Sequence, residues 1–435
     1  MMERLTKGQV IKLTSGKECR VLKELGEGGQ GYIYKVRYEG KDMALKWYKM
    51  DKIADKGKFY RNLQNNIKKG APTKAFVWPV ELTVPIDGGF GYLMDLIPDG
   101  YAEFKHYLLA DVNFSGIKAL INAALGLIDG FEKLHNAGFS YQDLNDGNFS
   151  IHPETGDVLI CDNDNVSEYG DNSGIAGKCR YMAPEVVRHE AKPSIHTDRF
   201  SLAVVLYKML FVEHPLEGKR TVSKYPCMRE DYEIECYGIH PIFTWDPMDS
   251  CNRPVRGVHT NTIKLWPYYP EFVHKAFADA FSQARLTGTD IRHRMTEQEW
   301  REVFVALRDC LARCSCGDET FIDPDAAECI CMNCGKKLSR PYFLHLKKSK
   351  VVLVPGKKLY ACHTMEDNAD CFTITADVVR NPQNPSIWGL HNISGRSWRV
   401  MLPNGTERII ENGRSMQIGR GIRINFGDTC EGTIF

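Results

Sequence analysis

The sequence has 435 residues, too many for one hydrophobic core of ordinary size, so two or three domains are expected. Its 56 lysines and arginines nearly balance 55 acidic residues, which excludes a global field that would attract nucleic acid or an anionic membrane. No apolar run is long enough for a membrane span, the first residues lack an apolar signal core, and fifteen cysteines are spread along the chain. We therefore expect a cytoplasmic protein in a reducing compartment that binds neither nucleic acid nor membrane.

The first predicted elements are strands. Residues 21–47 alternate apolar and polar positions around glycine turns, which predicts a hairpin followed by a further strand. Apolar residues at helical spacing predict a helix over residues 58–69, and strands are predicted at 76–82 and 91–97. The beginning of the chain is therefore expected to form a small, β-rich lobe.

Helical spacing dominates the middle of the chain. Helices are predicted at residues 114–137, 201–211, 270–284 and 297–310. Short apolar runs separated by turns predict strands at residues 351–354, 399–402, 408–411 and 422–426. The chain order therefore predicts a β-rich lobe, a larger helical lobe and a second β-rich part.

A glycine-rich segment occupies the first predicted hairpin. It fits the pattern G-x-G-x-x-G and consists of Gly26, Glu27, Gly28, Gly29, Gln30 and Gly31. Glycines let backbone N–H groups approach phosphates because no Cβ intervenes. A Rossmann unit is the alternative, but it would place a helix after the glycines, whereas a strand carrying Ala44 and Lys46 follows here. Lys46 is therefore a candidate phosphate-binding lysine.

A group of polar residues follows the helix predicted at 114–137. Asp143 and Asn148 are five positions apart, the spacing at which an aspartate accepts a hydroxyl proton and an asparagine holds a metal. A polar Asx-rich turn is the alternative interpretation. Asp162 comes directly after a strand-like run, and carboxylate and amide oxygens are ligands that suit Mg²⁺. These residues predict metal-assisted phosphoryl transfer.

In this order of motifs, residues 20–310 resemble the eukaryotic-type protein kinase family. Ala183-Pro184-Glu185 is similar to the family's A-P-E segment, Asp198 to the aspartate that opens its central helix, and Arg294 to the arginine that pairs with the glutamate. The resemblance implies an α+β, bilobal fold that uses ATP and Mg²⁺ to phosphorylate serine or threonine hydroxyls of protein substrates. It also implies adenine binding by the gatekeeper and hinge residues, which are Met94, Asp95, Leu96 and Ile97.

One departure from the family pattern concerns the partner of Lys46. In the family this lysine pairs with a glutamate of the first small-lobe helix. The corresponding predicted helix has no carboxylate, so Lys46 would have to be oriented by an amide, from Gln64 or Asn65, or by Asp51 or Asp55 just before the helix.

Other departures lie in the large lobe. Gln142 replaces the arginine that commonly receives a phosphorylated activation loop, Asn145 replaces a lysine typical of serine/threonine kinases, and Lys178 stands where a threonine is expected. Asn163 and Asp164 replace the last two residues of D-F-G. The missing helix carboxylate and the altered D-F-G favour the alternative of a pseudokinase scaffold that binds nucleotide or partner proteins without turnover, whereas the retention of Lys46, Asp143, Asn148 and Asp162 weighs against it. A small-molecule kinase of related fold is disfavoured by the A-P-E segment.

Two cysteine pairs separated by fourteen residues follow the last predicted helix. They are Cys314 with Cys316, and Cys331 with Cys334. This spacing is close to that of zinc ribbons, in which four thiolates hold a structural Zn²⁺. The metal would supply folding energy that a segment of about 25 residues cannot obtain from apolar burial. Ordinary free thiols are the alternative, and Cys310 and Cys329 are reserve ligands.

The last hundred residues predict a β-sandwich because short strands alternate with polar turns. The stretch is similar to forkhead-associated domains, which bind phosphothreonine peptides, and Ser394 or Arg396 would then be phosphate ligands. A packing or docking module is the favoured interpretation.

Four domains are therefore predicted. They are a small lobe at residues 1–97, a large lobe at 98–310, a zinc-ribbon-like module at 311–338 and a β-rich, forkhead-associated-like domain at 339–435. This combination resembles certain bacterial eukaryotic-like kinases, some of which are encoded with a metal-dependent phosphatase and a von Willebrand A protein. The resemblance implies these two proteins as partners.

Overall fold

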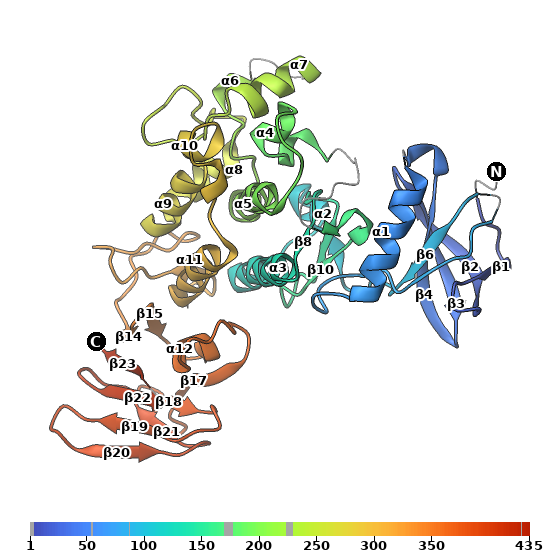
Figure 1. The fold of residues 1–435 in the computed structure, drawn as a ribbon. Helices are drawn as coiled ribbons and strands as arrows, with labels where there is room; N and C mark the ends of the chain where they lie inside the picture. Colours follow the sequence, from blue (N-terminus) through green and yellow to red (C-terminus); the bar gives the residue numbers. More distant parts are fainter. Residues whose placement is uncertain (1–3, 54, 87, 169–176, 223–228, 428) are drawn as a thin grey trace. The chain divides into compact units, whose positions relative to one another are not determined.

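The computed structural model describes residues 4–53, 55–86, 88–168, 177–222, 229–427 and 429–435. It divides into two units, each described below by itself (Figure 1). The first unit comprises Met1–Ser115, Asn122–Thr262 and Phe277–Gln298, and the second comprises Gly116–Ile121, Ile263–Ala276 and Glu299–Phe435. None of the helices among the described residues combines the length and apolar character needed to cross a membrane.

A twisted antiparallel sheet begins the first unit and is drawn in blue in Figure 1. Its strands, in sheet order, are β1 Val10–Lys12, β2 Glu18–Glu27, β3 Gly31–Tyr38, β4 Lys41–Tyr48, β6 Gly91–Met94 and β5 Glu81–Leu82. Side chains alternate between the two faces of a strand, so Leu45 and Trp47 of β4 join one buried apolar cluster. The other face of β4 carries Lys46 and Tyr48, which both point toward the candidate site.

Helix α1 Lys56–Lys69 covers the face of the sheet that carries Tyr48. It begins after Asp55, whose Oδ1 accepts a hydrogen bond from the N–H of Lys58 at 2.9 Å, and so caps the first turn. Phe59 and Leu63 are buried against Tyr48, as helical spacing requires. The helix predicted at residues 58–69 is confirmed, with a start two residues earlier.

The strand predicted at residues 76–82 is wrong for most of its length, because only Glu81–Leu82 forms a strand. Phe76 makes an isolated bridge with Ile160, and Val77 N–H donates to the Ile160 carbonyl at 2.8 Å. The buried residues 76–79 therefore form an irregular connection between lobes, since Pro79 cannot continue a hydrogen-bonded strand there.

Helices dominate the middle of the chain. The helices of the middle of the chain are α2 Phe104–Leu108, α3 Ile117–Asn136, α4 Pro184–Val187, α5 Ile195–Phe211, α6 Lys219–Val222, α7 Glu230–Glu233, α8 Thr260–Leu265, α9 Glu271–Ala280, α10 Gln283–Leu286 and α11 Glu297–Asp309. Short strands complete the helical lobe: β7 Ala102–Glu103, β8 Phe139–Ser140, β9 Phe149–Ile151, β10 Val158–Ile160 and β11 Ser167–Glu168. The small β-rich lobe and larger helical lobe are thus confirmed.

Helix α5 forms the centre of the helical lobe and is buried along most of its length. Tyr207 packs edge-on against Phe243 and Phe277, with ring centroids 5.7 and 5.2 Å away. The helix begins six residues before the predicted start at 201, because Ser194 and Thr197 form a hydrogen-bonded cap. This earlier start places Asp198 in the first turn, facing the loop that carries Asp143.

A buried network of charged side chains connects α3, α5 and the start of α11. His135 Nδ1 lies 2.9 Å from Glu297 Oε1, and His135 Nε2 lies 3.2 Å from Asp198 Oδ2. Burial lowers the pKa of His135, but hydrogen bonds to Asp198 and Glu297 outweigh burial and raise this pKa above its usual value. Glu297 is also bound by Arg199, and its own pKa is lowered to about 2 against the effect of burial. Carboxylate contacts to both ring nitrogens therefore favour the protonated imidazole.

This network predicts that part of the stability depends on pH. Because the folded pKa of His135 exceeds its unfolded value of about 6.5, the contribution is fully present below that pH and is lost as pH rises through the folded pKa. We expect the difference in free energy of unfolding between the wild type and His135→Gln to shrink as pH rises above 6.5, in denaturant titrations. His293→Gln, at an exposed histidine, is the control, and an unchanging difference for His135→Gln would contradict the prediction.

The second unit contains three antiparallel sheets, of which the smallest pairs β12 Leu311–Arg313 with β13 Glu319–Phe321. The strands of the largest sheet, in order, are β15 Lys350–Leu353, β14 Tyr342–Leu346, β23 Cys430–Ile434, β22 Arg423–Gly427, β19 Trp398–Met401 and β20 Glu407–Ile410. Those of the next largest sheet are β16 Lys358–Tyr360, β17 Ile374–Arg380, β18 Trp388–Asn392 and β21 Ser415–Gln417, with helix α12 Ala361–Thr364 after β16. Side chains from these two larger sheets, including Leu390 and Trp398, share one core. The predicted all-β end of the chain is confirmed.

Candidate functional site

The glycine-rich segment forms the turn between β2 and β3. Gly28 N–H donates to the Gly31 carbonyl at 2.8 Å, which closes the hairpin. Gly31 must be glycine for packing, since a Cβ there would lie 2.4 Å from the Trp47 carbonyl oxygen. A Cβ on Gly26 or Gly29 would meet no atom within 4 Å, so the protein's own packing does not require glycine at those two positions. Space for a ligand is one physical reason to keep them small.

The predicted gatekeeper and hinge follow on β6. Met94 lies opposite Ala44 in the β4–β6 register, so these two side chains border the same edge of the sheet. The strand ends at Met94, and Asp95, Leu96 and Ile97 are irregular. Across the described ranges, the backbone N–H and carbonyl groups of these three residues make no hydrogen bond with other backbone groups. They are therefore available to a planar, hydrogen-bonding ligand.

Lys46 is buried and contacts two carboxylates. Its Nζ lies 2.8 Å from Asp164 Oδ2 and 3.2 Å from Asp162 Oδ1. Burial lowers the pKa of Lys46, but the two carboxylates outweigh burial and raise it above its usual value. The ammonium group therefore remains charged in a site where only 5% of its side chain is exposed.

The partners predicted for Lys46 from the sequence were wrong. Gln64 and Asn65 are exposed on α1, Asp55 caps that helix through the N–H of Lys58, and Asp51 is exposed beside Lys52. The helix has no side chain that replaces the family's glutamate, because its buried positions are taken by apolar residues and an asparagine. The anionic partner comes instead from the segment after β10.

The segment after β10 is fixed by its own side chains. Asp162 has left-handed backbone angles, φ 49° and ψ 46°, which a short Asx side chain tolerates better than most residues. Asn163 donates from Nδ2 to the carbonyls of Val77 and Ile160, both at 2.8 Å. Asp164 is completely buried and accepts a hydrogen bond from the Tyr48 hydroxyl at 2.5 Å. These contacts therefore hold two carboxylates toward Lys46.

Asp143 and Asn148 are in direct contact. Asn148 Nδ2 donates to Asp143 Oδ2 at 3.1 Å, and Asn145 Nδ2 donates to Asp143 Oδ1 at 3.0 Å. Burial raises the pKa of Asp143 to about 6, because it outweighs these hydrogen bonds. A carboxylate whose pKa lies near neutrality is suited to accept a proton. Because the Asn148 amide nitrogen faces Asp143, its oxygen remains for another ligand.

The loop before Asp143 is held by hydrogen bonds to helix α5. Asp198 accepts hydrogen bonds from the backbone N–H groups of Tyr141, at 2.6 Å, and Gln142, at 2.9 Å. Gln142 donates from Nε2 to the hydroxyls of Ser140 and Ser167, so its side chain is engaged with neutral groups. On the far side of the loop, Cys161 N–H donates to the Asn148 carbonyl at 2.8 Å, which brings Asp162 beside Asn148. The four predicted side chains thus converge within one unit.

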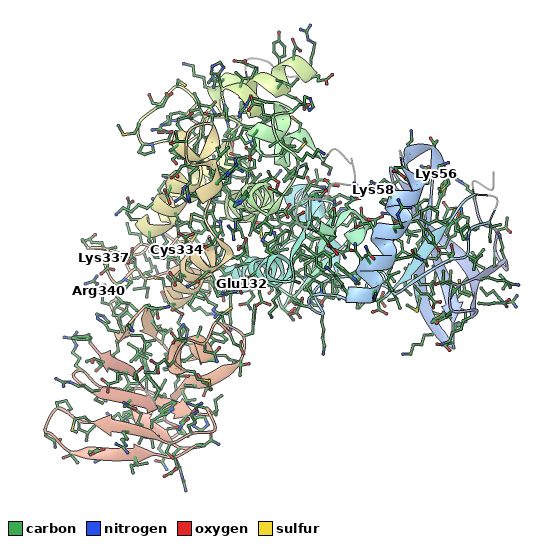
Figure 2. The ribbon with its side chains drawn as sticks, viewed as in Figure 1. Lys56, Lys58, Glu132, Cys334, Lys337 and Arg340 are labelled. Atoms are coloured by element: carbon green, nitrogen blue, oxygen red, sulfur yellow. The ribbon has the colours of Figure 1, made fainter. Side chains whose placement is uncertain are left out.

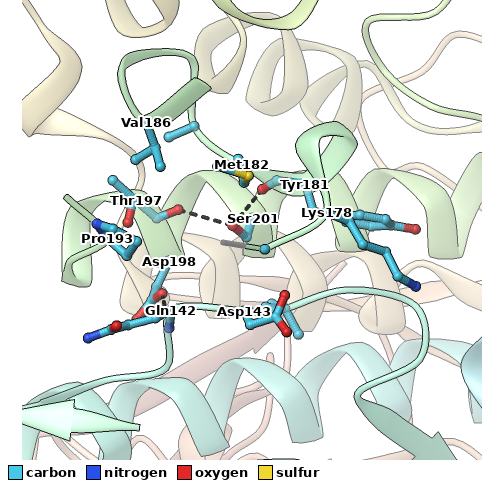
Figure 3. A pocket seen from close by; sticks show the side chains of 13 residues that line it. Gln142, Asp143, Lys178, Tyr181, Met182, Val186, Pro193, Thr197, Asp198 and Ser201 are labelled. Atoms are coloured by element: carbon cyan, nitrogen blue, oxygen red, sulfur yellow. Dashed lines mark hydrogen bonds between the residues drawn. The ribbon is translucent and has the colours of Figure 1, made fainter. Parts of the chain in front are cut away.

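A pocket opens beside Asp143 (Figure 3). Gln142 and Asp143 lie on one side of it and Met182 and Val186 on the other, while Ser201 closes its base through hydrogen bonds to the carbonyls of Tyr181 and Thr197.

Two residues of the site were missed by sequence reasoning about function. Asp164 was noted only as a departure from D-F-G, and Tyr48 was not singled out. Tyr48 stands two positions after Lys46, so both side chains lie on the same face of β4. That spacing, together with a second aspartate two positions after Asp162, was the available signal.

A cluster of thiols lies in the second unit. The Sγ atoms of Cys314, Cys316, Cys331 and Cys334 lie within 4.8 Å of one another. The Cys314–Cys334 and Cys316–Cys331 sulfur pairs are each separated by 3.7 Å. Figure 2 labels Cys334, which precedes Lys337 and Arg340 on the same loop. Cys310 and Cys329, predicted as reserve ligands, are outside the cluster, so the structure groups four cysteines that could hold a metal ion.

Comparison with known proteins gives one family. The sequence profile described as "Protein kinase domain" matches residues 19–269, more than half of the chain. The chain is 26% identical over 212 residues to serine/threonine-protein kinase AtPK2/AtPK19 of Arabidopsis thaliana, which covers 47% of this chain and 43% of that protein. It is 26% identical over 202 residues to serine/threonine-protein kinase A-Raf of Homo sapiens, covering 44% and 32%.

A third relative, serine/threonine-protein kinase mos of Xenopus laevis, is 24% identical over 272 residues, covering 59% of this chain and 72% of that protein. The chain spans less than half the length of the Arabidopsis and human relatives. The buried, bidentate pair between Glu185 and Arg294, with both N–O distances 2.7 Å, lies at positions where the sequence resemblance expected an ion pair. The profile match and these positions together show that the chain belongs to the protein kinase family.

Proposed function

We propose that this protein is an active kinase that transfers the γ-phosphoryl group of ATP to serine or threonine hydroxyls of proteins. The observation that carries the proposal is the convergence of four side chains in one site. Lys46 contacts Asp162, Asp143 contacts Asn148, and the backbone of Cys161 joins the two pairs. Serine/threonine specificity is supported by the names of the relatives described above.

The residues take the following roles in the proposal. The glycine-rich turn covers the phosphates, Lys46 binds the α- and β-phosphate oxygens, and Asp143 accepts the proton of the acceptor hydroxyl. The acceptor oxygen bonds to the γ-phosphorus as the bond to the β,γ-bridging oxygen breaks, so that ADP leaves. The raised pKa of Asp143 supports its role as proton acceptor, because burial makes the carboxylate a stronger base.

Asn148 and Asp162 fit a magnesium ion by their chemistry. Mg²⁺ prefers carboxylate and amide oxygens, and the Asp162 side chain is 46% exposed, so it can reach a solvated ion. When bound, Mg²⁺ neutralises charge on the β- and γ-phosphates. Asp162 and Asn148 would hold the ion, while Lys46 matches the remaining phosphate charge.

The pseudokinase alternative is not favoured. Its main argument was the absence of a helix carboxylate to pair with Lys46. Asp164 and Asp162 supply carboxylates to this lysine, so the phosphate-binding cation has a partner.

A phosphoryl-transfer assay tests the proposal. The purified chain is incubated with γ-labelled ATP, Mg²⁺ and a generic protein substrate such as casein, beside Asp143→Asn and Asp146→Asn. Asp143→Asn should lower incorporation by about 10²–10⁴-fold, because it removes the proton acceptor. Asp146 lies in the same loop but bonds to Lys178, so Asp146→Asn is the matched control. Equal incorporation by the wild type and Asp143→Asn would refute the proposal.

We further propose that the cysteine cluster holds a structural zinc ion. Four sulfurs at about 2.3 Å from Zn²⁺ in a tetrahedron lie about 3.8 Å apart. The two Sγ–Sγ separations of 3.7 Å, with all four sulfurs within 4.8 Å of one another, support this arrangement. None of the cysteines in the described ranges forms a disulfide, which supports a reducing, cytoplasmic location.

We propose that the β-sandwich is a packing or docking module. The Ser394 hydroxyl donates to Asn392 Oδ1 at 2.7 Å and accepts from Trp398 Nε1 at 3.1 Å, so it is engaged within its own turn. This supports a structural role for Ser394 over phosphopeptide binding. A metal-dependent phosphatase and a von Willebrand A protein remain proposed partners that rest on the resemblance, and co-purification from the source cell tests them.

A further inference from the structure

We propose that Asp164, held by Tyr48, is the positioning residue that orients Lys46 and so replaces the carboxylate missing from α1. This inference rests on the proposed kinase function and identifies a further residue of that site. Asp164 acts through Lys46 and does not touch the phosphates itself.

The contacts separate Asp164 from Asp162. Asp164 Oδ2 lies 2.8 Å from Lys46 Nζ and its side chain is completely buried, whereas Asp162 Oδ1 lies 3.2 Å away and 46% of its side chain is exposed. Asp162 is the carboxylate that solvent and a hydrated ion can reach. When Asp162 turns to another ligand, Asp164 keeps its contact with the ammonium group, because the protein excludes water from it.

Tyr48 fixes the Asp164 carboxylate. The same oxygen that contacts Lys46 accepts the Tyr48 hydroxyl hydrogen bond at 2.5 Å. The Tyr48 ring is itself held at 5.1 Å from the ring of Phe59 on α1 and 5.3 Å from that of Phe90. Oδ2 is thus both ion-paired and hydrogen-bonded, whereas the buried Oδ1 has no hydrogen-bond partner among the described residues. A buried carboxylate oxygen held by a cation and a hydroxyl has a defined position. The Lys46 ammonium group therefore contacts a carboxylate, that of Asp164, whose position is fixed.

Helix α1 acts on Lys46 indirectly. Asn62 and Asn66 both donate from Nδ2 to the carbonyl oxygen of Val166, each at 2.8 Å. Val166 stands two residues after Asp164, so these amides hold the segment that carries the carboxylate. The α1 sequence contains no acidic residue, and the helix thus supports the carboxylate instead of supplying it.

The test compares Asp164→Asn, Tyr48→Phe and Tyr92→Phe in steady-state kinetics with full-length protein, MgATP and a protein substrate. We expect Asp164→Asn to lower kcat by about 10–100-fold through loss of orientation, with little change in the KM for ATP. Tyr48→Phe should lower kcat as well, by a smaller factor. Tyr92→Phe is the matched control, since within the described chain its buried hydroxyl has no hydrogen-bond partner. Tyr48→Phe also reports on the proposal if Asp164→Asn does not fold.

A Lys46→Met background distinguishes orientation of Lys46 by Asp164 from a role as a metal ligand. If Asp164 works only through Lys46, then Lys46→Met combined with Asp164→Asn is no slower than Lys46→Met alone. The proposal would be overturned if the double variant lost kcat by the product of the losses in the two single variants. It would also be overturned if Asp164→Asn needed a higher Mg²⁺ concentration, because Asp164 would then be a metal ligand.

Two further outcomes distinguish the inference from the proposed function. A kcat for both Asp164→Asn and Tyr48→Phe within about twofold of wild type, while Asp143→Asn is inactive, would overturn the inference and leave the kinase assignment intact. No transfer by the wild type would overturn the assignment, and the inference with it.

Discussion

Replacing Asp162 by asparagine should lower kcat for phosphoryl transfer by at least about 10³-fold. The change removes the anionic oxygen proposed to hold Mg²⁺ and one of the two carboxylates that contact Lys46, at 3.2 Å. The size of asparagine is nearly that of aspartate, so the left-handed turn should survive, because Asn also tolerates that backbone conformation. Single-turnover transfer from γ-labelled ATP measures the effect.

Asp157→Asn provides the control for this experiment. Asp157 is an exposed aspartate in the turn that precedes β10, where it accepts a hydrogen bond from the Thr155 hydroxyl at 2.8 Å. It carries the same charge without facing Lys46. Activity of Asp162→Asn equal to that of Asp157→Asn would mean that Asp162 holds no catalytic metal.

The second large effect is expected in the cysteine cluster. Cys331→Ser should reduce bound zinc from about one ion per chain to almost none, measured by elemental analysis of freshly purified protein. Because a segment of this size depends on its metal for folding, amide hydrogen exchange of residues 311–338 should become fast at the same time. The Cys331 thiol is buried and lies 3.7 Å from the Cys316 thiol. Its replacement therefore removes a ligand from the interior of the cluster.

Cys329→Ser is the matched control for the zinc prediction. Its Sγ lies 3.6 Å from the Asp323 carbonyl and is not part of the four-thiol group. The Cys329→Ser protein should keep its zinc, and amide hydrogen exchange of residues 311–338 should stay slow. Wild-type protein without zinc, or Cys331→Ser with its full zinc content, would contradict the structural metal site.

The sequence predicted those residues of the site that can be recognised by their spacing from a neighbouring motif. Lys46, Asp143, Asn148 and Asp162 each stand at a fixed spacing from a glycine, strand or turn, and the structure brings all four together. The contact between Lys46 and Asp164 joins residues 118 positions apart, so no local pattern contains it. Spacing alone could not show which of several polar residues would face the lysine.

Burial explains the errors in the predicted elements. Residues 76–78 are apolar and consecutive, which is typical of a buried strand, yet they are buried as an irregular connection against Ile160. Periodicity reports that side chains are buried and does not identify the hydrogen-bond partners of the backbone. Helices α1, α3 and α11 were placed within three residues because several turns of amphipathic spacing leave little ambiguity, whereas the start of α5, a helix buried along most of its length, was misplaced by six residues.

The two asparagines of α1 that bind the Val166 carbonyl have a consequence for ionic conditions. Attraction between full charges at a protein surface weakens as dissolved ions accumulate, whereas a hydrogen bond between an uncharged amide and a carbonyl is much less affected. These two amide contacts between α1 and the segment that carries Asp164 should therefore change little between dilute buffer and concentrated salt, whereas the exposed Lys69–Glu168 ion pair of the same helix should weaken.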